Sequence, residues 1–417
     1  MPQTIDELRK VRMEKLEKLQ SQGIMGFPAW AGKRETVLET RSKKLGAGVF
    51  VAGRLTALRG HGGLLFADLT DESGKIQLSF KKDNLEKKFE LLSLLDLGDF
   101  ILVEGKLYET QSKELTVEVS NFELLTKSLR PLPSSWYGFS DVEERYRQRY
   151  VDLLMNPEVK KVFETRSQVI KLVRKYLDEA GFLEVQTPIL QPLYGGATAK
   201  PFTTHHNALD IDLYLRVSDE LYLKRLIVGG FEKVYEMGKD FRNEGIDRQH
   251  NPEFTMCEFY WAYANYGDLM KLSEEMIAEI IKEITGGYVL EYQAKKYNFT
   301  PPWPRVTYRD LIFKDSGIDI DVINTEEKLL AEIKKTPRLR PGQEKVKLDL
   351  EGVVGFAALL DTFYKAISRP NIVGPMFLTD YPAEMLPLAK KKSDEPSKVA
   401  SFQLLVGGYE WIKAYNE

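Results

Sequence analysis

Charged and aromatic side chains suited to binding a charged ligand are concentrated in the segment FRNEGIDRQHNPEFTMCEFY, residues 241–260. Side chains alternate between the two faces of a strand, so two strands joined by a polar loop are expected here. Arg242 and Glu244 then share one face of the first strand. One face of the second strand carries Phe254, Met256, Glu258 and Tyr260. Because buried charges need partners or ligands, this surface predicts a binding site rather than a hydrophobic core.

The loop between these strands, residues 245–252, carries groups that suit phosphate, namely Arg248, His250 and Asn251. A guanidinium group binds phosphate oxygens through two parallel hydrogen bonds. The pattern alone also fits a solvent-exposed hairpin whose charges form surface ion pairs.

The whole segment closely resembles motif 2 of the class II aminoacyl-tRNA synthetases in its lysine-specific form, with Gln249 before the His-Asn pair. The resemblance implies that lysine is activated with ATP, as a second substrate, and transferred to the 3′ end of its tRNA. It implies catalytic roles for Arg242, Glu244 and His250. The ATP-binding residues that it implies are Arg242, Glu244, Arg248, His250, Asn251 and Phe254.

The same resemblance implies a closed pocket for lysine. Its residues are Gly196, Glu220, Arg242, Glu258, Tyr260, Tyr415 and Glu417. Gly196 and Glu220 match positions that hold the α-ammonium group, and Tyr260 and Glu417 match those that hold the ε-ammonium group. From its own pattern, Glu220 is also explained as a charge on a helix surface, since Lys224 follows four residues later.

Glu410 and Gln403 match positions that hold Mg²⁺ against ATP in this family. Gln403 is a neutral amide where the family has a carboxylate, and a neutral ligand binds a hard cation less tightly. Lys413 stands where an Asn normally lines the site. Motif 3, with an Arg for the γ-phosphate, is expected after Glu417 and does not occur in the sequence. We therefore expect poor activation of lysine by this chain.

Five strand-like segments lie between Gly48 and Lys127, and a charged helical segment, residues 84–95, separates the third from the fourth. This order is that of an OB-fold, a barrel that binds oligonucleotides on its strand 2–3 face. Arg59, Phe66 and Gln77 offer a guanidinium for phosphate, a ring for stacking and an amide for a base edge. Phe66 is also explained as a core residue. The spacing of the three resembles the anticodon-reading set of the same family, which implies tRNA(Lys) as the partner.

These elements predict an α+β protein: a five-stranded OB-fold barrel, then a class II synthetase domain built on an antiparallel sheet flanked by helices. The expected parts are an N-terminal helix and lead-in (1–47), the barrel (48–128), a proline-rich linker (129–145) and the catalytic domain (146–417). The helix expected over 157–180, Gly181 and the strand ending near Pro188 resemble motif 1. In the family that motif builds the interface of a homodimer.

The composition sets limits on partners and location. The 417 residues include 59 basic and 62 acidic side chains, so a nucleic-acid partner needs a local basic surface. The single cysteine, Cys257, excludes an internal disulfide and fits a cytoplasmic protein. No apolar run approaches the roughly 18 residues of a membrane span, so no membrane association is expected.

Three alternatives remain at this point. An aspartate or asparagine enzyme shares the barrel, but an anionic substrate is repelled by Glu220, Glu258 and Glu417. A tRNA-binding protein that no longer catalyses is favoured by Gln403, Lys413 and the missing motif 3. The family member that modifies a protein with lysine usually lacks the barrel.

Overall fold

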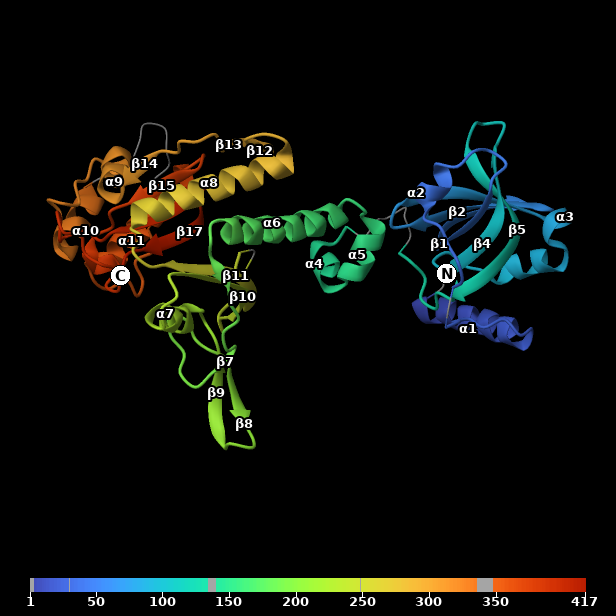
Figure 1. Cartoon of the computed structure of the whole chain (residues 1–417), viewed down its shortest axis with the longest axis horizontal. Helices are drawn as coiled ribbons and strands as arrows, with labels where there is room; N and C mark the ends of the chain where they lie inside the picture. The colour runs from blue at the N-terminus through green and yellow to red at the C-terminus, as the bar shows by residue number, and fades with distance from the viewer. Residues whose placement is uncertain (1–3, 30, 134–139, 248, 336–347) are drawn as a thin grey trace. The chain divides into compact units, whose positions relative to one another are not determined.

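The computed structural model describes residues 4–29, 31–133, 140–247, 249–335 and 348–417 (Figure 1). Its contacts divide the chain into two compact units, Met1–Lys160 and Lys161–Glu417. The α+β class predicted from the sequence is confirmed.

The first unit contains a closed five-stranded barrel. Its strands are β1 (Gly48–His61), β2 (Leu64–Asp71), β3 (Gly74–Lys81), β4 (Phe100–Glu109) and β5 (Leu115–Thr126), in the spatial order β1-β2-β3-β5-β4. Alternate residues of β4, Ile101, Val103 and Leu107, are buried in the barrel core, as the period of a strand requires. The predicted barrel is thus confirmed.

Short helices accompany the barrel. Helix α1 (Ile5–Ser21) begins with the capping box expected from Thr4 and Glu7, and α2 is Val37–Arg41. The helical segment expected over residues 84–95 is present between β3 and β4. It consists of α3 (Lys82–Leu85) followed by a 3₁₀-helix, η1 (Glu86–Leu94). Glu86 has a φ of 47°, in the left-handed region, and this conformation ends the α-helix.

Two further helices, α4 (Val142–Arg147) and α5 (Arg149–Met155), belong to the first unit by their contacts. The division between units falls after the predicted linker of 129–145, near the start of α6 (Val159–Glu179). Gly181 follows α6 with a φ of 83°, as suits a glycine beyond a helix end.

The second unit holds its strands in four sheets within the described ranges, and antiparallel pairing predominates, as expected. The sheets are β11-β10-β6, β7-β9-β8, β12-β13 and β14-β15-β16-β17 in the described residues. The bounds are β6 Leu183–Glu184, β7 Leu190–Gln191, β8 Thr203–His206, β9 Ile211–Leu215, β10 Lys233–Phe241, β11 Glu253–Trp261, β12 Val289–Tyr292, β13 Lys295–Asn298, β14 Arg305–Thr307, β15 Met376–Thr379, β16 Ser401–Val406 and β17 Tyr409–Tyr415. Pairing is antiparallel except for β6 with β10 and β14 with β15.

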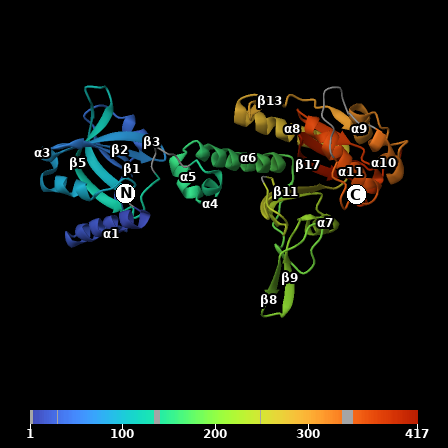
Figure 2. The ribbon, with the colours of Figure 1, turned by 180° about the vertical axis from the view of Figure 1, so that it is seen from behind.

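Helices cover both faces of the four-stranded sheet. They are α8 (Tyr266–Thr285) on one face and α9 (Tyr308–Ser316), α10 (Glu326–Lys335) and α11 (Phe356–Ile367) on the other, with short 3₁₀-helices η2 (Arg369–Asn371) and η3 (Ala383–Met385) next to α11. Helix α7 (Glu220–Val228) packs against β10 and β11 instead. Phe402 and Leu404 of β16 pack against α8, whereas Leu405 packs on the side of α9, α10 and α11. Figure 2 shows the β8–β9 hairpin projecting from the rest of this unit. No helix in the described ranges is long and apolar enough to cross a membrane.

Candidate active site

The β10–β11 hairpin forms one wall of the candidate site. Phe254, Met256, Glu258 and Tyr260 of β11 share a face, as predicted. The expectation that Arg242 and Glu244 belong to the first strand is wrong, because β10 ends at Phe241. Beyond that residue the amide of Asn243 donates to the carbonyl of Lys200, 2.8 Å away, and this contact takes the backbone away from β11.

Arg242 is held at the end of the hairpin by two contacts. Its guanidinium carbon lies 5.1 Å from the centroid of the Phe254 ring, and Nε donates to the carbonyl of Val217 at 3.5 Å. Its backbone amide donates to the carbonyl of Pro252 at 2.8 Å. A planar guanidinium fixed in this way presents a fork of donors to a carboxylate or a phosphate.

The loop beyond Arg242 is exposed but internally bonded. The Asp247 carboxylate accepts from the amides of Gln249 and His250, and the His250 ring lies 2.7 Å from its second oxygen. These bonds lower the pKa of Asp247 to about 2. Glu244 is exposed, and Asn251 donates to the carbonyl of Glu253. Arg248, a predicted ATP ligand, lies outside the described residues.

Three predicted lysine-binding residues from distant parts of the chain, Glu220, Tyr415 and Glu417, meet beside the hairpin. Glu220 is buried at the start of α7, and the Tyr415 hydroxyl donates to it at 3.5 Å. The Lys224 ammonium lies 2.5 Å from a carboxylate oxygen of Glu220 and 2.5 Å from one of Glu417. Glu220 is therefore both paired with Lys224 and buried in the cluster, and a surface ion pair is too simple a description. The Lys224–Glu417 contact was not expected.

Carboxylates and phenols dominate the electrostatics of this cluster. Burial raises the pKa of Glu258 to about 7, and nearby Asp240 and Glu220 add to the effect, while a hydrogen bond from Ser218 at 2.8 Å opposes it. Burial raises the pKa of Tyr415 to about 12 and raises that of Tyr260 further. The only cation that contacts the described carboxylates of the cluster within ion-pair distance is Lys224. The cluster therefore suits a cationic ligand.

Gly196 lies against the start of α7. Its φ is 87°, and a Cβ at this position would come within 2.8 Å of both the Glu220 Cβ and the Ser218 Oγ. Any larger residue would therefore displace Glu220. The predicted pair of Gly196 and Glu220 is adjacent in space.

Glu410 and Gln403 lie on neighbouring strands of the four-stranded sheet. Gln403 pairs with Lys413 and Leu405 with Glu410, across a bulge between Leu404 and Leu405. Because paired residues share a face, the bulge brings Glu410 to the face that carries Gln403 and Lys413. No group of three His, Cys, Asp or Glu side chains among the described residues is arranged to hold a metal ion.

This donor set nevertheless fits Mg²⁺ bound together with a nucleotide. At such sites the ion is commonly held by one or two carboxylates and the substrate phosphates. Glu410 supplies one carboxylate, and Gln403 supplies an amide oxygen. Lys413 counts against tight binding, because its charge acts on Glu410 and repels a second cation.

A buried charge cluster behind the pocket was not found from the sequence. Arg216 contacts Asp219, Glu236 and Asp240, and all four side chains are almost fully buried. A signal was present: Glu236, Gly238 and Asp240 alternate at the period of a strand, which places two carboxylates on one face with a glycine between them.

The three residues predicted to read an anticodon share one face of the barrel. Arg59 pairs with Phe66 across β1 and β2, and Asp68, two residues after Phe66, pairs with Gln77 of β3. Phe66 is half-buried and does not belong to the barrel core, which contradicts its explanation as a core residue. Arg59 forms an ion pair of 2.8 Å with Asp68, whose role the sequence did not indicate.

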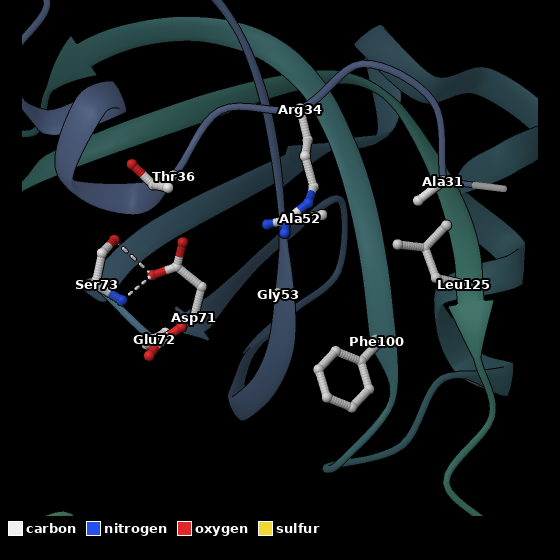
Figure 3. A pocket seen from close by; sticks show the side chains of 10 residues that line it. All are labelled: Ala31, Arg34, Thr36, Ala52, Gly53, Asp71, Glu72, Ser73, Phe100 and Leu125. Carbon is white, nitrogen blue, oxygen red and sulfur yellow. Dashed lines mark hydrogen bonds between the residues drawn. The ribbon is translucent and has the colours of Figure 1, made fainter. Parts of the chain in front are cut away.

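A separate pocket of about 500 Å³ lies elsewhere on the barrel (Figure 3). Arg34, Asp71 and Phe100 line it, and none of the predicted site residues does. The Asp71 carboxylate accepts from Ser73 and from the amides of Val37 and Gly74, so its bonds hold the local turn.

Comparisons with known proteins agree with this geometry. Residues 141–417 match the family of tRNA synthetases class II (D, K and N), and residues 49–125 match the OB-fold nucleic acid binding domain. A lysine–tRNA ligase of Moorella thermoacetica is 46% identical over 99% of this chain and 83% of its own length. The lysine–tRNA ligases of Pelotomaculum thermopropionicum and Carboxydothermus hydrogenoformans are 43% and 42% identical, over 81% and 84% of their lengths and 99% and 100% of this chain. The chain belongs to the class II tRNA synthetases and, within them, to the lysine–tRNA ligase family.

Proposed function

We propose that the chain activates L-lysine with ATP to form lysyl-adenylate and transfers the lysyl group to the 3′ end of tRNA(Lys). The observation that carries this proposal is the cluster beside Arg242, where Glu220, Glu258 and Glu417 gather with Tyr415. Three carboxylates opposed by one ammonium group, that of Lys224, form a site for a ligand that carries two ammonium groups. The names of the relatives support the same substrate.

In the proposed reaction a carboxylate oxygen of lysine attacks the α-phosphorus of ATP, and pyrophosphate leaves. Such a step depends on positioning and on neutralising charge, so it needs no nucleophile from the protein. Arg242 would bind the α-phosphate and the lysine carboxylate, and Phe254 would stack on adenine. Glu244 would accept from the adenine amino group.

The outer phosphates and the ribose are assigned to the loop. His250 and Asn251, with Arg248, would bind them. Glu410 and Gln403 would hold Mg²⁺, which supplies positive charge to the phosphates when it is bound.

Specificity follows from the charge of the pocket. Glu220 and Gly196 would hold the α-ammonium group, and Tyr260 with Glu417 the ε-ammonium group. A neutral analogue leaves these buried groups without a partner, and an acidic amino acid is repelled by them. Both effects favour lysine over norleucine, aspartate and asparagine.

The barrel would bind the anticodon through Arg59, Phe66 and Gln77, with the Phe66 ring stacked on the central uridine. A half-buried ring on the barrel face, outside the hydrophobic core and paired with Arg59, supports this assignment. We also infer a homodimer through α6 and the segment after it, since apolar side chains are exposed there, at Val162, Leu183 and Leu190. The site of action would be the cytoplasm.

The test is exchange of pyrophosphate into ATP with lysine, norleucine, aspartate or asparagine, followed by charging of tRNA(Lys). Of the four amino acids, only lysine is expected to support exchange, and at a low rate, because Gln403 and Lys413 weaken the proposed Mg²⁺ site. Exchange that depends on aspartate or asparagine would refute the proposal.

A second candidate, a tRNA-binding protein without catalysis, is favoured by Lys413 opposite Gln403. It predicts tight binding of tRNA(Lys) without exchange for any amino acid.

A further inference from the structure

Behind the lysine pocket, one buried arginine faces three buried carboxylates. The Arg216 guanidinium lies 2.8 Å from Asp219, 2.6 Å from Glu236 and 3.2 Å from Asp240. Exposure is 1% for Arg216, 0% for Asp219 and Asp240, and 4% for Glu236. If all four groups were ionised, two uncompensated negative charges would be buried together, which is very costly.

The three carboxylates differ in their hydrogen-bond partners. One Glu236 oxygen accepts from Arg216 at 2.6 Å, and the other accepts from the amide and the hydroxyl of Thr187 at 3.0 and 2.6 Å. Neither oxygen of Asp219 or of Asp240 accepts a hydrogen bond from a protonated donor among the described residues. The two carboxyl groups lie against the same guanidinium, Asp219 at 2.8 Å and Asp240 at 3.2 Å. A single proton between them supplies the missing donor and removes one of the excess charges.

The surroundings of Asp219 and Asp240 favour the protonated form of these carboxyl groups. Burial raises the pKa of Asp219 to about 8, with the charge of Asp240 adding to the effect and Arg216 opposing it. Burial also raises the pKa of Asp240, against the charges of Arg216 and Arg242. The ionisable groups that act on the pair from the neighbouring strands and loops are Arg216, Glu236, Arg242, Cys257 and Glu258.

The segment that contains Asp219, residues 216–220, touches the substrate pocket. The Arg216 carbonyl accepts from Phe241 at 2.9 Å, and the Val217 carbonyl accepts from Arg242 at 3.5 Å. Ser218 donates to Glu258 at 2.8 Å, and Glu220 itself ends the segment. Three residues of the proposed lysine site therefore depend on where this segment lies.

We propose that Asp219 and Asp240 share one proton and act as positioning residues, which hold segment 216–220 against β10 and so keep Arg242, Glu220 and Glu258 in place. The pair itself does not touch the substrate. The sharing of a proton is independent of the reaction, whereas the effect on lysine rests on the function proposed above.

Thermal unfolding measured as a function of pH tests whether Asp219 and Asp240 share a proton in the folded protein. A buried carboxyl whose folded pKa is raised keeps its proton when the unfolded chain has lost it, so stability falls as pH rises from its unfolded pKa toward its folded pKa. Asp219→Asn keeps the hydrogen bond to Asp240 but cannot titrate. Between pH 5 and pH 8 the melting temperature of the parent should therefore fall relative to that of Asp219→Asn by at least about 5 °C.

Asp394→Asn is the matched control, because the Asp394 side chain is 75% exposed. Its melting curve should run parallel to that of the parent. Infrared difference spectra of the parent against Asp219→Asn should show the carbonyl band of a protonated carboxyl group at pH 7. Parallel melting curves for Asp219→Asn and the parent, with no such band, would overturn the shared proton.

Lysine binding measured by calorimetry tests the positioning role. Asp219→Ala should weaken lysine binding at pH 7 by at least about tenfold, and Asp219→Asn should recover most of that loss. Equal lysine affinity in the parent and in a folded Asp219→Ala variant would refute the positioning role. If the parent protein binds no lysine, the proposed function is refuted instead. The melting curves and the infrared spectra would still show whether Asp219 and Asp240 share a proton.

Discussion

Glu258 shows how the surroundings of a single residue set its chemistry. It lies on β11 within the proposed lysine site, and its pKa is raised to about 7 by burial, with Asp240 and Glu220 adding to the rise. Near neutral pH the free protein therefore holds this carboxyl group partly protonated. An ammonium group bound beside it favours the charged form, so lysine binding and loss of a proton are linked.

This linkage predicts that lysine binds more tightly as pH rises from 6 to 8, by at most about tenfold per unit below the pKa. Calorimetry in two buffers of different ionisation enthalpy measures both the affinity and the proton released. Glu258→Gln should remove this proton release. An affinity for lysine that does not change over this range would contradict the prediction.

Tyr260 provides a second prediction about the pocket. A hydrogen bond to a charged group contributes about 1.5–3 kcal/mol. Tyr260→Phe should therefore reduce the preference for lysine over norleucine by about ten- to a hundredfold. The measurement is the ratio of the two affinities. Tyr263→Phe, at an exposed position, is the control and should leave the ratio unchanged. An unchanged ratio in Tyr260→Phe would place the ε-ammonium elsewhere.

Phe66 carries the prediction for the barrel. Phe66→Ala should weaken binding of tRNA(Lys) by about 1–3 kcal/mol, the contribution of one stacked base. Phe50→Ala is a suitable control, because Phe50 is exposed on the same barrel, on β1, away from Arg59 and Gln77. Circular dichroism should show both variants folded. Equal loss in the two variants would indicate that the barrel face proposed here is not the binding face.

At the level of the elements, the Arg216 side chain packs closely against the backbone of β10 at Gly238. A Cβ there would come within 2.0 Å of Arg216 Nη2. The end of an arginine side chain can usually move, but this one is held by Glu236, Asp219 and the Lys239 carbonyl. Gly238 therefore makes room for the charge cluster behind the pocket.

Gly238→Ala should consequently destabilise the second unit by about 1–3 kcal/mol, the usual cost of overpacking. Thermal or urea unfolding measures the change. Gly374→Ala is the control, since a Cβ at Gly374 has no atom within 4 Å. Equal stability of the two variants would show that Arg216 moves freely.

Elements set by local pattern could be predicted from the sequence, and those set by distant contacts could not. The capping box of α1, the barrel strands and the glycine after α8 are local signals, and the structure has each of them. The end of β10 depends on Lys200, more than forty residues from Asn243 in the chain, and no local pattern shows that contact. The Arg216 cluster was missed because its carboxylates come from two segments, Asp219 from the segment before α7 and Glu236 and Asp240 from β10.

At the scale of the whole molecule, the residues proposed to bind the anticodon and those proposed to bind lysine and ATP lie in different units. The barrel has its own hydrophobic core, and the second unit has three others. The residues proposed for the anticodon lie on β1, β2 and β3, whereas those proposed for lysine and ATP lie between Gly196 and Glu417. Ligand binding protects the backbone that it orders, because opening must then also release the ligand.

Hydrogen exchange of the full chain should therefore separate the two activities. An RNA hairpin with the tRNA(Lys) anticodon should slow exchange in β2 and β3, and lysine with a non-hydrolysable ATP analogue should slow it in β10, β11 and the start of α7. Phe66→Ala should remove only the first effect and Tyr260→Phe should weaken only the second, since each residue lies in one unit. An RNA hairpin with an altered anticodon is the control. Protection of β10 and β11 by the RNA hairpin alone would contradict this division and place its binding site in the second unit.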